Sequence, residues 1–225
     1  MKNGITELVF ILDKSGSMAG MEKDTIGGFN SMIEKQKGVD GIAYVSTVLF
    51  SNVSTVLHDR VNVKEIKPLT EREYFVGGGT ALLDAIGRSI RHIGNIHKYA
   101  REEDVPEKTI FVITTDGMEN MSREFGSREV KEMIERQKEK YGWEFLFVAT
   151  NIDAVTTAET FGIGRDRAVN YNLKHGTKMM YEDLDLTLRE FRQSGGIKKG
   201  WEKVFEEHQS EAITPKTAQT PDKNN

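Results

Sequence analysis

The sequence predicts an α/β fold: a doubly wound, mostly parallel, six-stranded Rossmann-like sheet with helices on both faces. Segments rich in strand-forming residues alternate with amphipathic helical segments, and this order is typical of parallel sheets. Several predicted strands are continuous apolar runs, as expected where helices cover both faces of a sheet. The length of 225 residues suits one such domain with a short tail.

The first half of the chain begins with an apolar run, residues 7–12, that predicts a buried strand. Residues 21–37 then show the three- and four-residue apolar spacing of an amphipathic helix. Residues 42–50 and 53–57 are rich in β-branched and apolar side chains. The two-residue turn between them predicts an antiparallel pair, so the sheet should contain one antiparallel edge strand.

The second half repeats the alternation of helix and strand. Three glycines precede a predicted helix at residues 80–97, and residues 109–114 form a second buried apolar run. A charged amphipathic helix at 127–141 and a strand at 143–149 follow. The remaining predicted elements are a short helix at 154–161, a last edge strand at 168–171 and a final helix at 177–193.

The domain boundary is expected at residue 200. Residues 201–225 are mostly polar, and we expect a disordered C-terminal tail because such a segment cannot bury enough apolar surface to offset the entropy of ordering. The domain itself should therefore occupy residues 1–200.

Composition limits the possible functions. The formal net charge of −4 gives no basic field for nucleic acid or an anionic membrane. The absence of cysteine excludes disulfides, zinc ribbons and thiolate chemistry. No signal sequence or membrane-length apolar stretch is evident, so we expect a cytoplasmic protein.

The most informative motif lies directly after the first buried strand. Asp13, Ser15 and Ser17 occupy alternate positions, and Gly16 allows the sharp turn that would make their oxygens converge. A carboxylate with two hydroxyls is a ligand set for a hard cation such as magnesium, manganese or calcium.

Two further residues would complete such a site. Thr80 follows the three glycines, and Asp116 follows the buried run at residues 109–114. In a doubly wound sheet, ligands bind beyond the carboxyl ends of the strands. If the strands before Asp13 and Asp116 are neighbours, the three loops meet at one point.

These residues give the sequence its resemblance to the von Willebrand factor A (VWA) family. The family's metal-ion-dependent adhesion site has the pattern Asp-x-Ser-x-Ser, a distant Thr and a distant Asp, and residues 78–86 are similar to its Gly-Gly-Thr helix start. The resemblance covers roughly residues 5–195 and implies the strand order 3-2-1-4-5-6. It implies these metal ligands: Asp13, Ser15, Ser17, Thr80 and Asp116.

The charge of this ligand set suggests how it would work. Only two of the five ligands are anionic, so a divalent ion is at most neutralised. Magnesium, or manganese, is coordinated by six oxygens, so five protein ligands leave one position for an outside ligand. Calcium is the less favoured ion for this site. The resemblance implies that this ligand is a partner protein's Asp, Glu or C-terminal carboxylate.

Structural interpretations compete with the metal site at each position. Asp13 could be an ordinary loop acid, with Ser15 and Ser17 capping the next helix, but the complete set of five favours a metal. An EF-hand fits poorly because Met18 stands where its invariant glycine should be.

Four other side chains lie near the candidate metal ligands in the sequence. Glu119 and Asn120 are expected to be solvated loop residues, and Lys14 to lie on the rim or simply be exposed. Asp84, one turn beyond Thr80, either supports the site or only keeps its helix soluble.

Two other functions remain open. The chain could be a magnesium-dependent phosphoryl-transfer enzyme with Asp13 as nucleophile, but Ser15 stands where such enzymes have a second Asp. No nucleophile elbow or Walker A motif is present, so we predict a binding module without enzymatic activity. It could also be a subunit of a larger machine, since it resembles soluble VWA proteins that work beside AAA+ ATPases, metal chelatases or tellurite-resistance systems.

Overall fold

The computed structural model describes residues 4–150, 152–171 and 177–205, which form one six-stranded sheet with the order β3-β2-β1-β4-β5-β6. Only the β2–β3 pair is antiparallel; the other neighbours are parallel. Both the predicted fold class and the strand order are therefore confirmed. The strands are β1 (Thr6–Asp13), β2 (Ala43–Phe50), β3 (Ser54–Asn62), β4 (Lys108–Thr115), β5 (Glu144–Ala149) and β6 (Ala168–Asn170).

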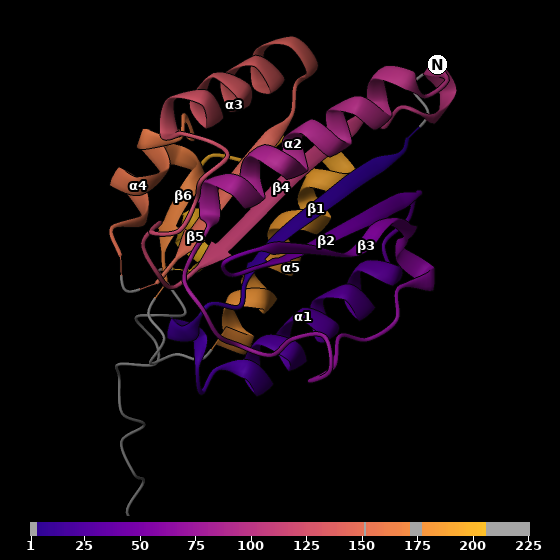
Figure 1. Ribbon diagram of the computed structural model, residues 1–225. Helices are drawn as coiled ribbons and strands as arrows, with labels where there is room; N and C mark the ends of the chain where they lie inside the picture. Colours follow the sequence, from indigo (N-terminus) through magenta and orange to yellow (C-terminus); the bar gives the residue numbers. More distant parts are fainter. Residues whose placement is uncertain (1–3, 151, 172–176, 206–225) are drawn as a thin grey trace, which may run out of the picture.

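Helices cover both faces of the sheet (Figure 1). One face carries α1 and α5, and the other carries α2, α3 and α4. Their bounds are α1 (Glu22–Lys37), α2 (Leu82–Tyr99), α3 (Ser127–Tyr141), α4 (Ala154–Thr160) and α5 (Thr177–Ser194).

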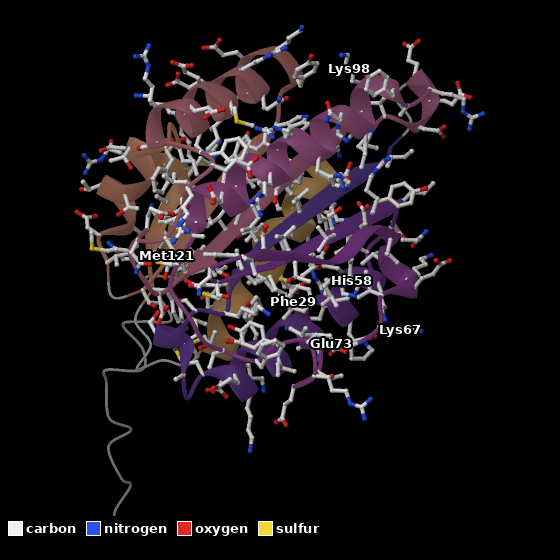
Figure 2. All side chains as sticks on the ribbon, in the orientation of Figure 1. Phe29, His58, Lys67, Glu73, Lys98 and Met121 are labelled. Carbon is white, nitrogen blue, oxygen red and sulfur yellow. The ribbon has the colours of Figure 1, made fainter. Side chains whose placement is uncertain are left out.

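Two apolar cores result, one on each face of the sheet. Alternate residues of β1 belong to different cores: Phe10 packs edge-on against Phe29 of α1, while Val9 and Ile11 face the α2 side. Phe29 is labelled between α1 and the sheet in Figure 2. Because both faces are buried, β1 has no polar side, which explains its continuous apolar run.

The strand register brings two loops together at one edge of the sheet. β1 and β4 are parallel neighbours, with Leu12 opposite Thr114, so Asp13 ends its strand beside Thr115 and Asp116 follows directly. This is the adjacency that the sequence required for a shared site.

The C-terminal boundary differs from the expectation. Trp201 and Phe205 are buried and pack edge-on against each other, and Phe205 also meets Tyr171. The domain thus continues at least to Phe205 because two aromatic side chains extend the core beyond residue 200. The rest of the expected tail, 206–225, lies outside the described residues. Among the described helices, none has the length and apolarity needed to cross a membrane.

Candidate metal centre

Asp13, the last residue of β1, is held by contacts to both carboxylate oxygens. Its Oδ2 accepts a hydrogen bond of 2.6 Å from Thr115 Oγ1, and its Oδ1 accepts one of 2.7 Å from the backbone N–H of Ser15. The Tyr74 hydroxyl donates to the Asp13 carbonyl at 2.5 Å. Asp13 is 1% exposed, so the carboxylate is fixed in a buried setting before any ligand binds.

The two serines connect Asp13 to Asp116. Ser17 Oγ donates to Asp116 Oδ1 at 2.7 Å and lies 3.0 Å from Ser15 Oγ. Because the single hydroxyl proton of Ser17 goes to Asp116, Ser15 is the donor in the contact between the two serines. Both hydroxyls therefore point their protons along a chain that ends on a carboxylate, as a pre-oriented ligand set requires.

Thr80 joins the same cluster. A Cβ placed on Gly117 would lie 3.2 Å from Ser17 Oγ and 3.3 Å from Thr80 Oγ1, so both hydroxyls converge on this glycine. Asn120 fixes the Thr80 backbone from both sides: its Oδ1 accepts from Thr80 N at 2.9 Å, and its own N–H donates to Thr80 O at 3.0 Å. Thr80 precedes α2, which begins two residues later at Leu82, rather than opening the helix.

Glycines make the close approach of these loops possible. The Gly16 N–H donates to Gly78 O at 2.9 Å, and a Cβ on Gly16 would lie only 3.2 Å from that oxygen. A side chain on Gly79 would collide with Met121, labelled in Figure 2, and would reach Asn120 Oδ1. The glycine run before Thr80 is therefore needed for the close packing of these loops.

Burial raises the pKa of both carboxyls. For Asp13 desolvation is the main cause, opposed by the hydrogen bonds from Thr115 and Ser15, and the neighbouring charge of Asp116 raises the pKa further. For Asp116 desolvation again dominates over the hydrogen bond from Ser17. Two desolvated carboxylates near one another are stabilised by a cation between them.

The donor chemistry fits a hard divalent ion. All five candidate ligands offer oxygen, and only two of them are carboxylates. The described residues contain no group of three or more His, Cys, Asp or Glu side chains that could hold a metal ion. The structure brings together all five residues predicted from the sequence: Asp13, Ser15, Ser17, Thr80 and Asp116.

Sequence reasoning missed the residues that orient these ligands. Thr115, Tyr74 and Asn120 each hold a ligand residue through a hydrogen bond. Thr115 had a detectable signal, since a hydroxyl immediately before Asp116 ends the neighbouring strand. Asn120 was expected near the site, but only as a solvated loop residue. Tyr74 had no signal, because its contact depends on the path of a long loop.

One expectation about nearby residues was incomplete and another was wrong. Asn120 is exposed and Glu119 is half-buried, but Glu119 also accepts hydrogen bonds from the backbone N–H groups of Met121 and Ser122, and Asn120 holds Thr80. Lys14, in contrast, is not exposed. It is 7% exposed, with its ammonium 4.1 Å from the ring centroid of Phe75.

Asp84 supports the site indirectly. Its carboxylate accepts backbone hydrogen bonds from Arg123, Glu124 and Phe125. It thereby ties α2 to the loop that follows Asp116, which is a structural role rather than one in helix solubility.

No protein-family model and no curated protein matches this sequence. Solved structures do. The vWF domain of the type V pili tip protein Mfa5 from Porphyromonas gingivalis is similar with a TM-score of 0.60 and 9% identity, over 86% of this chain and 98% of that one. A D319A mutant of the PilB minor pilin from Streptococcus sanguinis is similar with a TM-score of 0.58 and 13% identity, over 85% of this chain and 63% of that one.

A third similar structure contains a metal. Proximal thread matrix protein 1 (PTMP1) from the mussel byssus, with a zinc-occupied MIDAS motif, gives a TM-score of 0.53 and 11% identity, over 83% of this chain and 46% of that one. This chain likewise spans 45% of the ArnB paralog VWA2 from Sulfolobus acidocaldarius. At these identities the likeness shows the fold alone.

Proposed function

We propose that this chain, whose fold is that of von Willebrand factor A domains, is a divalent-metal-dependent protein interaction module. A magnesium or manganese ion would be held by Asp13, Ser15, Ser17, Thr80 and Asp116. The ion would supply an electrophilic position for a carboxylate of a partner protein. The observation that supports this most is the hydrogen-bonded chain from Asp13 through both serines to Asp116 at the carboxyl ends of β1 and β4.

The charge balance favours an anionic partner. Asp13 and Asp116 carry two negative charges, and the three hydroxyl ligands carry none. A divalent ion is therefore at most neutralised, and five protein oxygens leave one of the six positions that magnesium prefers. A carboxylate from an Asp or Glu side chain, or from a C-terminus, suits that position. The zinc-occupied MIDAS motif of the mussel PTMP1 supports a divalent ion at the corresponding place.

The residues of the motif disfavour the phosphoryl-transfer alternative. An aspartyl phosphotransferase normally has a second Asp two residues after its nucleophile, and this chain has Ser15 there. We therefore propose binding rather than catalysis. An AAA+ ATPase system remains among the candidate partners.

The deciding experiment combines metal binding with partner capture. Calorimetric titration of magnesium and manganese should give one site in the wild type and none in Asp13→Ala or Asp116→Ala. An exposed acid on α1 provides the control, Asp24→Ala, which should bind metal normally.

Partner capture then tests the carboxylate. A pull-down with magnesium should enrich a protein that is lost with EDTA, and changing its contacting acid to the amide should weaken binding as strongly as chelation. Equal binding in EDTA would leave the metal at most a structural role and would overturn the proposal.

A further inference from the structure

A cavity of about 450 Å³ lies between α2 and α3, at the end of the sheet opposite the metal centre. Its lining residues Pro106 and Trp143 stand just before β4 and β5, so it is at the amino ends of these strands, whereas the metal centre is at their carboxyl ends. Lys98, another lining residue, is labelled well away from Met121 in Figure 2. The volume is within the range of about 300–1,000 Å³ that is typical of small-molecule sites.

The floor of the cavity is apolar and preformed. The lining residues Ile90, Pro106 and Trp143 are buried. Trp143 stacks on Phe111 of β4 with 5.3 Å between the ring centroids, and the His97 ring meets it edge-on, also at 5.3 Å. A flat apolar group can therefore pack against this floor without a rearrangement of the core.

A buried carboxylate fixes His97, which forms one wall of the cavity. His97 Nε2 lies 2.6 Å from Oε2 of Glu7, which is 0% exposed, and Arg60 Nε donates to the other oxygen of Glu7 at 3.0 Å. A carboxylate paired with an arginine only accepts hydrogen bonds, so Nε2 of His97 carries a proton and donates it to Glu7. The imidazole is thus held in one orientation from below and from the Trp143 side.

The rim of the cavity is positively charged. Arg91 and Lys98 of α2 and Arg136 of α3 are exposed lining residues, and none of the described lining residues is acidic. Arg91 is paired with Glu124 at 3.0 Å, but within the described part of the chain no ion pair involves Lys98 or Arg136. In a chain of net charge −4, a cleft bordered by cations of one sign concentrates anions.

We propose that this cavity binds a small organic anion with a flat apolar body, for which an aromatic carboxylate is the simplest model. The body packs on the floor at Trp143, and the anionic group lies at the rim beside Lys98 and Arg136. A guanidinium group can bind a carboxylate through two parallel hydrogen bonds, which suits Arg136 to this role. The site is separate from the metal centre, because about 20 Å of helix α2 lies between Leu82 and His97.

Naphthoate is a suitable probe, and heteronuclear NMR is the measurement. The chain has two tryptophans, so two indole N–H signals report on two places. Naphthoate should shift the signal of Trp143 and leave that of Trp201, which belongs to the core on the other face of the sheet. Naphthamide and naphthylmethylammonium share the apolar body but lack the negative charge. Each should bind at least about fivefold more weakly than naphthoate, since two exposed ion pairs are lost.

One substitution fills the cavity without disturbing its walls. A Cβ on Gly94 of α2 would lie 3.7 Å from Gln137 Nε2 and 3.9 Å from Trp143 Cη2, which is ordinary van der Waals contact. The rest of the side chain in Gly94→Leu would then occupy the space of the ligand, and naphthoate should bind at least about tenfold more weakly because its apolar burial is lost. Gly27→Leu, at an exposed position of α1 with open space around it, is the matched control and should bind normally.

A second pair of variants tests the charge alone. Arg136→Gln keeps most of the side-chain length and should weaken naphthoate binding about twofold to fivefold, as expected for one exposed ion pair, while the affinity for naphthamide stays unchanged. Arg128→Gln removes the same charge from a highly exposed position of the same helix, outside the cavity, and should have no effect on either probe. Both positions are at the surface, so the fold is retained.

The test is independent of the metal centre. Naphthoate should bind equally in magnesium and in EDTA, and Gly94→Leu should keep the magnesium Kd of the wild type, so a failure of the proposed function leaves this result unaffected. A Trp143 signal that millimolar naphthoate does not move, or unchanged binding in Gly94→Leu, would overturn the inference. Equal affinity for naphthoate and naphthamide would also overturn it, because the occupant would then be an apolar group, such as a segment of a partner protein, rather than an anion.

Discussion

Gly117→Ala tests the geometry of the metal centre with the smallest possible change. The new Cβ would lie 3.2 Å from Ser17 Oγ and 3.3 Å from Thr80 Oγ1, which is tighter than ordinary van der Waals contact. The two hydroxyls must move apart by a few tenths of an ångström. Metal–ligand distances tolerate about ±0.2 Å, so we expect metal affinity to fall at least about tenfold.

The size of the effect follows from mass action. At a metal concentration of about 100 times Kd, a ligand stabilises the native state by about 2.7 kcal/mol, and a tenfold weaker site reduces this to about 1.4 kcal/mol. For a chain of this length the metal-induced rise in Tm should fall from about 5–11 °C to about 3–6 °C. Differential scanning calorimetry with and without magnesium measures both.

A matched glycine separates this effect from general changes of stability. Gly27 lies on α1 with open space where a Cβ would stand, so Gly27→Ala should keep the full metal-induced shift even if its own Tm changes. If Gly117→Ala also keeps the full shift, Ser17 and Thr80 cannot both be ligands in the arrangement described.

Three further predictions concern pH, catalysis and the C-terminus. Burial raises the pKa of Asp13 and Asp116 above the ordinary value of 3.8, so the folded metal-free protein binds more protons than the unfolded chain between 3.8 and the raised pKa. Relative to a variant with both Asp13→Asn and Asp116→Asn, the metal-free protein should therefore lose stability as pH rises through that window, while metal affinity should rise; a stability difference from this variant that grows with pH would contradict the burial argument. Phosphatase and ATPase assays with magnesium should give only background, and a rate lost specifically in Asp13→Asn would restore the enzyme alternative. Deleting residues 206–225 should leave the Tm and the magnesium Kd unchanged, and a large loss of either would show that this segment contributes to the fold.

The fold was predictable because its signals are local and repeated. The apolar runs of β1 and β4 identify strands covered on both faces, and the five candidate ligand residues follow strands or glycines at recognisable spacings. Their convergence then required one assumption, that β1 and β4 are neighbours, which the family resemblance supplied and the register bears out.

What the sequence did not reveal depends on distant partners. A lysine in a loop is normally exposed, yet Lys14 is buried, and its ammonium lies against the ring of Phe75, sixty-one residues away. Phe205 belongs to the core because it packs on Tyr171, which lies far from it in the sequence. Neither contact leaves a trace in local spacing.

The metal centre is assembled from three loops that hold one another. The Gly77 N–H donates to Lys14 O at 2.9 Å, and the Asn120 N–H donates to Thr80 O at 3.0 Å, so the loops after β1, before α2 and after β4 are connected through their backbones. Because these bonds involve no metal, the candidate ligand oxygens are ordered in advance, and binding an ion there would cost little conformational entropy. A single metal–carboxylate contact is common to any acidic partner and cannot distinguish one from another. Under the proposed function, discrimination would therefore come from the surfaces of the same three loops.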